Sequence, residues 1–266
     1  MPPRLAPLAA LIPDGALLAI PPDYSGVALR ATLELIRQGR RHLRLVTAPT
    51  SGLQADLLIG AGLVDEVETA GLSLGEFGGA PRFAAACKAG TLTVRDATCP
   101  AIHAGFQAAE KGVPFLPLRG ILGSDLLAHR PDWKVVQNPM TEGADPIVLV
   151  PAIRPDVALF HVALADRQGN VWVGMRRELA TLAHASARTL VTAETIHPGN
   201  LLDDPLLAPG TLPHLYVDHV VPTPHGTWPL PLLDRTPGDR VALAEYAKAA
   251  RTEAGFAALL ARWLDG

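Results

Sequence analysis

Residues 154–173 read RPDVALFHVALADRQGNVWV, and this stretch decides the fold class. The run Val157–Val162 is apolar apart from His161, which predicts a strand buried on both faces. Residues 166–170 contain Asp, Gly and Asn, which favour a turn, and Val171–Val173 then predicts a short return strand. A strand without polar–apolar alternation is typical of a parallel sheet covered by helices on both sides.

The rest of the chain alternates short apolar runs with helical patterns. Strands are predicted at residues 17–20, 43–47, 64–69, 92–94, 147–150, 157–162, 171–173, 189–192 and 217–221. Helices are predicted at residues 27–38, 56–60, 80–89, 102–110, 178–187, 239–250 and 253–264. This order predicts an α/β fold with an open, mostly parallel, layered sheet in one domain, residues 1–266. Ligands of such sheets lie beyond the carboxyl ends of strands, here the segments after Ile20, Thr47, Val94, Val162 and Thr192.

Composition excludes several classes of protein. The 266 residues carry a net charge of -3 and a pI near 6.3, which gives no electrostatic case for binding nucleic acid or an anionic membrane. No run approaches the roughly 20 apolar residues of a membrane span. The two cysteines, Cys87 and Cys99, are too few for a disulfide framework and are interpreted as free thiols in a reducing cytoplasm.

Several catalytic motifs are absent from the sequence. It has no Gly-x-Gly-x-x-Gly, no phosphate-loop lysine and no Gly-x-Ser-x-Gly. None of its nine histidines forms a His-x-x-x-His or His-x-His pair, so no metal site is predicted. His161 is interpreted as a strand-end histidine with a satisfied hydrogen bond. Glu194 is interpreted as a loop or subunit-interface carboxylate, although it follows a predicted strand.

A series of short segments, in the same order, resembles the A-type (alpha) subunit of family I coenzyme A (CoA) transferases such as glutaconate CoA-transferase. These segments are Leu11–Gly15, Ala80–Phe83, Gly112–Pro117, Leu122–Asp125, Arg154–Leu159 with His161, Asp166–Val171, Val217–Val221 and Pro224–Pro229. Glu34–Arg41 is similar to a segment of related ring-cleaving CoA hydrolases. The resemblance covers nearly the whole chain and implies the layered α/β sheet of that family.

The resemblance also implies an activity. Family I enzymes move CoA between carboxylic acids through a glutamyl-CoA thioester, and the nucleophilic glutamate lies in the B-type subunit. The nearest string here, Glu142-Gly143, lacks the asparagine of that motif. We therefore expect a homologous B-type partner to supply the nucleophile, with acyl-CoA and a carboxylic acid as substrates. Coenzyme A is then a substrate, and no cofactor is expected.

The resemblance places candidate site residues in two segments. Asp96 corresponds to a glutamate of the family and is the predicted catalytic residue, with Thr98 beside it for substrate binding. The other predicted substrate-binding residues belong to the central loop: Gly120, Gly123, Ser124 and Asp125. A structural interpretation stays open for both segments. Asp96 and Thr98 could cap the helix expected near Ile102, and the loop could be a turn before a helix.

Two departures from the family leave three functions open. At one of them, Asp96-Ala97-Thr98 stands where the family often has Glu-x-Ser. The family's Gly-Gly loop after the first strand is replaced by Pro21-Pro22, which removes two N–H donors and argues against an oxyanion role there. The first hypothesis is a CoA transferase completed by its partner. The second is a ring-opening acyl-CoA hydrolase subunit that uses its own carboxylate, Asp96. The third is a subunit that only binds and scaffolds.

Overall fold

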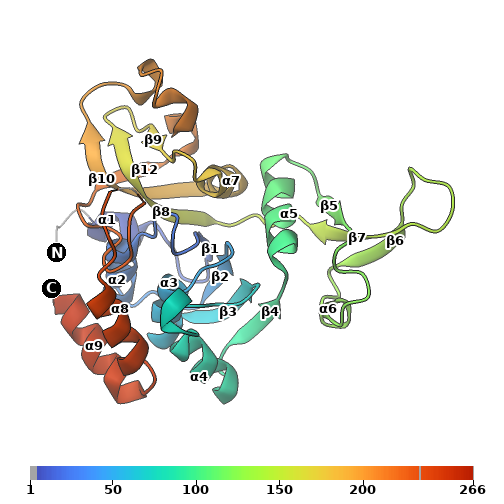
Figure 1. Ribbon diagram of the computed structural model, residues 1–266, viewed down its shortest axis with the longest axis horizontal. Helices are drawn as coiled ribbons and strands as arrows, with labels where there is room; N and C mark the ends of the chain where they lie inside the picture. The colour runs from blue at the N-terminus through green and yellow to red at the C-terminus, as the bar shows by residue number, and fades with distance from the viewer. Residues whose placement is uncertain (1–4, 234, 266) are drawn as a thin grey trace.

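The computed structural model describes residues 5–233 and 235–265, and one large sheet runs through its centre (Figure 1). Its strands are β1 (Leu17–Ile20), β2 (Leu43–Thr47), β3 (Val64–Thr69), β4 (Thr93–Asp96), β8 (Val157–Asp166), β9 (Val171–Trp172), β10 (Arg188–His197), β11 (Thr211–Leu212) and β12 (His219–Pro222). The parallel strands follow the order β4, β3, β2, β1, β8, β10, β12. The short strands β9 and β11 extend the sheet in antiparallel fashion.

The long strand β8 changes neighbours along its length. Its first residues, Val157 and Ala158, pair with β1, and its last, Leu164 and Ala165, pair with β9. On the other side, β10 accompanies it from Val157 to Asp166. Within the described residues, positions 159–163 therefore have no strand partner on the β1 side, which leaves room there beyond the carboxyl end of β1.

Helices cover both faces of the sheet. They are α1 (Leu5–Ala10), α2 (Leu29–Arg37), α3 (Leu53–Gly60), α4 (Pro81–Ala89), α5 (Cys99–Glu110), α6 (Leu126–His129), α7 (Arg177–Ala185), α8 (Arg240–Ala249) and α9 (Glu253–Asp265). Single 3₁₀ turns lie at Gly75–Phe77, Leu201–Asp203, Ala208–Gly210 and His214–Tyr216. Side chains alternate across each strand, so Leu18 packs with α1, α2 and α3 while Ala19 packs with α5 and α7. Helices α8 and α9 form a further layer outside α2 and α3.

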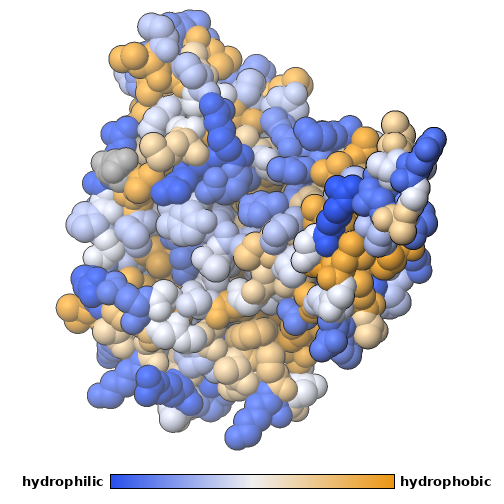
Figure 2. All heavy atoms as spheres, turned by 45° about the vertical axis from the view of Figure 1, so that its right-hand side comes forward, coloured by the Kyte–Doolittle hydropathy of each residue, from blue (hydrophilic) through white to orange (hydrophobic). Residues whose placement is uncertain are grey.

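A separate three-stranded antiparallel sheet projects beyond α5 (Figure 1). Its order is β5 (Phe115–Leu118), β7 (Pro146–Pro151) and β6 (Lys134–Gln137). Figure 2 turns this sheet toward the viewer and shows apolar atoms gathered on it. Phe115 is 41% exposed and Val135 is 52% exposed. This small sheet thus presents apolar side chains that the described residues do not cover.

The predicted fold class is confirmed, and the predicted strands and helices of the central layers are present with shifted ends. Two strands of the small sheet, β5 and β6, were not predicted: residues 115–118 contain a proline, and all of β6 is exposed. Residues 147–150 were expected in the same parallel arrangement, but they belong to the antiparallel β7. Within the described ranges, no helix combines the length and apolar character that crossing a membrane requires.

Candidate functional site

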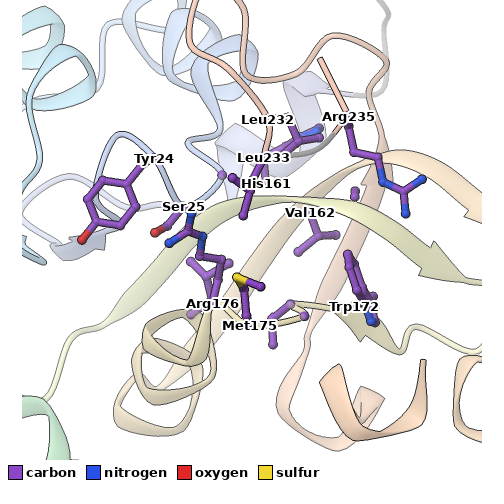
Figure 3. A pocket seen from close by; sticks show the side chains of 15 residues that line it. Tyr24, Ser25, His161, Val162, Trp172, Met175, Arg176, Leu232, Leu233 and Arg235 are labelled. Carbon is purple, nitrogen blue, oxygen red and sulfur yellow. The ribbon is translucent and has the colours of Figure 1, made fainter. Parts of the chain in front are cut away.

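A pocket of about 330 Å³ lies beside β8, beyond the carboxyl end of β1 (Figure 3). Segments far apart in the sequence line it. They are residues 24–26 after β1, 161–163 of β8, 172–176 at and after the end of β9, Leu179 of α7, and residues 232, 233 and 235. The volume falls in the range of about 300–1,000 Å³ that is typical of small-molecule sites. The pocket therefore occupies the space that β1 and β9 leave open along β8.

The loop after β1 is held against β8 by Gly26. The His161 amide donates to the Gly26 carbonyl at 2.7 Å. A Cβ at position 26 would lie 2.1 Å from the His161 carbonyl oxygen, and the residue has φ +94°. Both the close approach and the left-handed backbone require glycine. The loop that begins with two prolines thus ends at a fixed point on the pocket wall.

Asp23 ties the same loop to α3. Its carboxylate accepts from the amides of Gly52 and Leu53, both at 2.9 Å, at the start of that helix. Burial raises the pKa of Asp23 to about 7, although the two amides act in the opposite direction. Next in the loop, the buried Ser25 hydroxyl donates to Glu178 at the start of α7. These contacts fix the loop's position on both sides of the pocket.

Behind the pocket, His161 lies inside β8 and is fully buried. Its Nδ1 is 2.8 Å from the Thr192 hydroxyl, which confirms the predicted hydrogen bond. Its Nε2 lies 3.3 Å from Glu194. Burial lowers the pKa of His161, while contact with His161 and two bonds from the His225 amide hold the pKa of Glu194 at about 2. The interpretation of Glu194 as a loop carboxylate was wrong, because it lies within β10.

Two cationic side chains line the pocket, and each lies over an aromatic ring. The Arg176 guanidinium is 5.0 Å from the Tyr24 ring centre, and that of Arg235 is 5.8 Å from the Trp172 ring centre. Figure 3 shows the two guanidinium groups on opposite sides of Val162. The remaining lining is mainly apolar, so the pocket combines an apolar interior with positive charge.

Two glycines set the wall on the Trp172 side. A Cβ at Gly210 would lie 2.8 Å from the Gly174 Cα and 2.9 Å from Trp172 Nε1. A Cβ at Gly174 would lie 3.0 Å from the Trp172 ring. The backbone of residues 173–174 bonds directly to the Gly210 carbonyl. Close backbone contact therefore holds this wall in place.

The predicted catalytic and capping residues lie elsewhere on the same edge of the sheet. Asp96 is the last residue of β4 and is exposed, and one of its carboxylate oxygens accepts from the adjacent Ala97 amide at 3.0 Å. Thr98 is the N-cap of α5, where its hydroxyl accepts from the Ala101 amide at 3.3 Å. The structural interpretation thus holds for Thr98, whereas Asp96 does not cap the helix.

The central-loop candidates form a turn that precedes the short helix α6. Gly120, Gly123 and Asp125 are exposed, and Gly123 has φ +77°. The Ser124 hydroxyl accepts from the Leu126 amide at 3.2 Å. Asp125 precedes α6 without a side-chain capping bond. These residues therefore form a turn before a helix. Their role in substrate binding stays a prediction.

Arg130, the residue that follows α6, binds to the end of β4. Its guanidinium donates to the Asp96 carbonyl at 3.0 Å, to Glu68 at 2.7 Å and to Asp132. It also lies 4.2 Å from the Trp133 ring centre. Burial acts against its charge, but pairing with Asp132 and Glu68 raises the pKa of Arg130. One buried cation therefore joins the end of α6 to the end of β4.

The described residues contain no group of three or more His, Cys, Asp or Glu side chains arranged to hold a metal ion. Cys87 and Cys99 are both free and exposed.

Residues 4–222 match the family model described as coenzyme A transferase. The chain belongs to the coenzyme A transferase family. Among relatives of this CoA-transferase family member, the A-type subunit of 3-oxoadipate CoA-transferase from Pseudomonas knackmussii is 33% identical, over 69% of this chain and 65% of the relative. The A-type subunit of glutaconate CoA-transferase from Acidaminococcus fermentans is 30% identical, over 88% of this chain and 78% of the relative.

Solved structures of the family agree with this fold. Glutaconate CoA-transferase from Acidaminococcus fermentans superimposes with a TM-score of 0.90 at 27% identity, covering 98% of this chain and 87% of the other. A variant of the decarboxylase AibA/AibB gives a TM-score of 0.85 at 30% identity, covering 98% of this chain and 97% of the other. This CoA-transferase family chain spans 51% and 65% of the length of the first curated relatives that it matches.

The pocket beside β8 contains residues that sequence reasoning did not select. Arg176, Arg235 and Trp172 belong to segments without a catalytic motif, and only the fold brings them together. The sequence predicted part of this lining, because the segments after Ile20 and Val162 were expected at the ligand-binding edge of this CoA-transferase fold.

Proposed function

We propose that the chain is the A-type subunit of a CoA transferase that moves CoA between carboxylic acids. A homologous B-type subunit supplies the glutamate nucleophile, and acyl-CoA and a carboxylic acid are the substrates. Residues 1–266 act as one CoA-transferase alpha-subunit domain. The observation that carries this proposal is the family match across residues 4–222, together with two relatives whose names identify them as A-type subunits.

In this proposal, the partner covers the open edge of the sheet at β4. Asp96 and the 120–125 turn face the acyl-CoA there, with Thr98 at the head of α5. The exposed carboxylate and turn support this assignment, because a substrate could reach them. The apolar side chains on the projecting small sheet, such as Phe115 and Val135, support a protein contact nearby.

The experiment compares the full chain alone with the full chain co-expressed with its B-type partner. The partner is identified by mass spectrometry of the protein that copurifies with the tagged chain. We expect CoA transfer, followed as appearance of a new acyl-CoA after a second acid is added, only when both subunits are present. Turnover by rigorously partner-free chain would contradict the proposal.

A second candidate function is acyl-CoA hydrolysis of the ring-opening type, with Asp96 as general base or acid. The supporting observation is that the Asp96 carboxylate is exposed at the carboxyl edge of the sheet and forms no ion pair among the described residues. The same assay separates the two functions. A hydrolase adds water to its substrate without a second acid, whereas a transferase requires that acid.

A further inference from the structure

Strand β4 is the outermost strand of the large sheet, and among the described residues no further strand lies beside its last residue, Asp96 (Figure 1). On the inner side, the Ala97 amide donates to the Thr69 carbonyl of β3 at 3.0 Å. The Asp96 carbonyl belongs to the same peptide unit and points the opposite way, toward the open side of the strand. The sheet therefore provides a partner for the N–H of this peptide but not for its carbonyl.

Arg130 is the partner of that carbonyl. Its Nη1 donates to the Asp96 carbonyl at 3.0 Å. Its Nη2 donates to Glu68 at 2.7 Å and to Asp132 at 2.9 Å, and its Nε donates to Asp132 at 3.0 Å. The side chain is only 5% exposed and lies over the Trp133 ring. Because four of the five guanidinium N–H groups are used within the chain, this cation is built to hold protein groups and not a substrate anion.

The Asp96 side chain depends on the same peptide for its orientation. One carboxylate oxygen accepts from the Ala97 amide at 3.0 Å. Side chains alternate along a strand, so Asp96 lies on the opposite face from Arg95, whose guanidinium pairs with the same two acids as that of Arg130. Arg130 therefore reaches Asp96 through the backbone and not through the carboxylate. A rotation of the peptide would turn the carboxylate with it.

We propose that Arg130 is a positioning residue, which fixes the peptide between residues 96 and 97 so that the Asp96 carboxylate keeps one orientation toward the acyl-CoA. The inference rests on the proposed function, in which Asp96 faces that substrate. An arginine suits this task, because its planar group stays charged and binds several partners in fixed directions. Misplacement of a reacting group by about 1 Å can cost about 10²-fold in rate, so a small rotation of this peptide would lower turnover.

The first measurement is hydrogen exchange of the isolated full chain, which needs neither a partner nor turnover. Arg130→Lys keeps the positive charge beside the two acids, but an ammonium cannot donate to both acids and to the Asp96 carbonyl in one plane. We expect the Ala97 amide to exchange at least about tenfold faster than in the unaltered chain, because its peptide is held on one side only.

Arg95→Lys is the matched control for this exchange. Arg95 pairs with the same two acids but, in the part of the chain that the structure describes, not with the Asp96 carbonyl. The Ala97 amide of Arg95→Lys should therefore exchange at the rate of the unaltered chain. Equal exchange at Ala97 in Arg130→Lys and Arg95→Lys would overturn the proposal.

The second measurement is turnover of the chain assembled with its B-type partner. We expect Arg130→Lys to lower kcat by about 10- to 100-fold and to change KM by about threefold at most, because Arg130 does not bind the substrate itself. Arg130→Lys combined with Asp96→Asn should lose no more than Asp96→Asn alone, because both act through one carboxylate. Additive losses, or full turnover of Arg130→Lys where Asp96→Asn is impaired, would contradict the assignment.

Failure of the proposed function gives a different result. If the unaltered chain shows no CoA transfer with its copurified partner, that function is refuted, and hydrogen exchange alone decides whether Arg130 holds the peptide. Full turnover of Asp96→Asn would leave CoA transfer in place and overturn the role of Arg130. If Arg130→Lys does not fold, Asp132→Asn replaces it, because the guanidinium then loses the carboxylate that binds both its Nε and its Nη2. Both measurements should then change in the same direction.

Discussion

The pocket beside β8 and the Asp96 end of β4 lie at the same edge of one sheet, yet they are built differently. The pocket is enclosed by segments from both sides of β8, and its loop is fixed by Gly26, Asp23 and Ser25. Asp96 ends the outermost described strand and stands exposed. A central strand has neighbours on both sides that can close a site, whereas an edge strand has them on one side only. The described residues thus surround the pocket from several segments and leave the end of β4 open.

The largest expected effect is a loss of turnover at the open end of β4. We expect Asp96→Asn to reduce turnover of the chain assembled with its partner by about 10²–10⁴-fold, because the carboxylate is lost while size is kept. The melting temperature should stay unchanged, since Asp96 does not cap α5. Asp65→Asn, at an exposed residue near the opposite end of β3, is the matched control. Unchanged turnover of Asp96→Asn would remove the open edge from the chemistry.

A medium effect concerns stability at the pocket. The pKa of Glu194 is about 2 in the folded chain against 4.5 ordinarily, so the stabilisation is complete above pH 4.5 and is lost as the pH falls toward 2. After allowance for solvent screening of this partly exposed group, Glu194→Gln should lower the free energy of unfolding at pH 7 by roughly 1–3 kcal/mol and flatten its decline in acid.

Urea denaturation between pH 7 and pH 3 measures this change. Glu245→Gln, which alters an exposed acid on α8, should keep the acid slope of the unaltered chain. If the free energy of unfolding of Glu194→Gln declined in acid as steeply as that of Glu245→Gln, the lowered pKa of Glu194 would not contribute to stability.

The smallest effect concerns the open edge. Thr98→Ala removes the hydroxyl that accepts from the Ala101 amide and should cost about 1 kcal/mol of stability. Thr98→Asn should recover most of this loss, because asparagine also caps helices well. Thermal unfolding of the three proteins checks it. A turnover loss in Thr98→Ala that Thr98→Asn does not restore would instead assign the hydroxyl to the substrate.

The sequence predicted the central layers well because burial there leaves a strong pattern. Strand β1 is a continuous apolar run and β8 is nearly one, and parallel pairing between helical layers is what produces such runs. The projecting sheet escaped prediction for the opposite reason. Its strand β6, residues 134–137, is exposed throughout and therefore carries no alternation of polar and apolar residues.

The candidate sites differ in the same way. Thr98 could be interpreted from sequence, because capping depends on residues three apart along the chain. The pocket could not, because Arg176 and Arg235 become neighbours of one cavity only through the order of strands and the bridge between Leu232 and Thr236. A pattern within one segment cannot report a contact between segments.

The glycine contact at Trp172 has a consequence for how this protein can change. Because Gly174 and Gly210 touch through their backbones, any larger side chain at either position would displace the indole ring. That wall cannot be remodelled by single substitutions. Met175 and Leu233 also line the pocket, but both side chains are exposed. Substitutions that change the size of the pocket are therefore expected at exposed lining residues, whereas Gly174 and Gly210 stay unchanged.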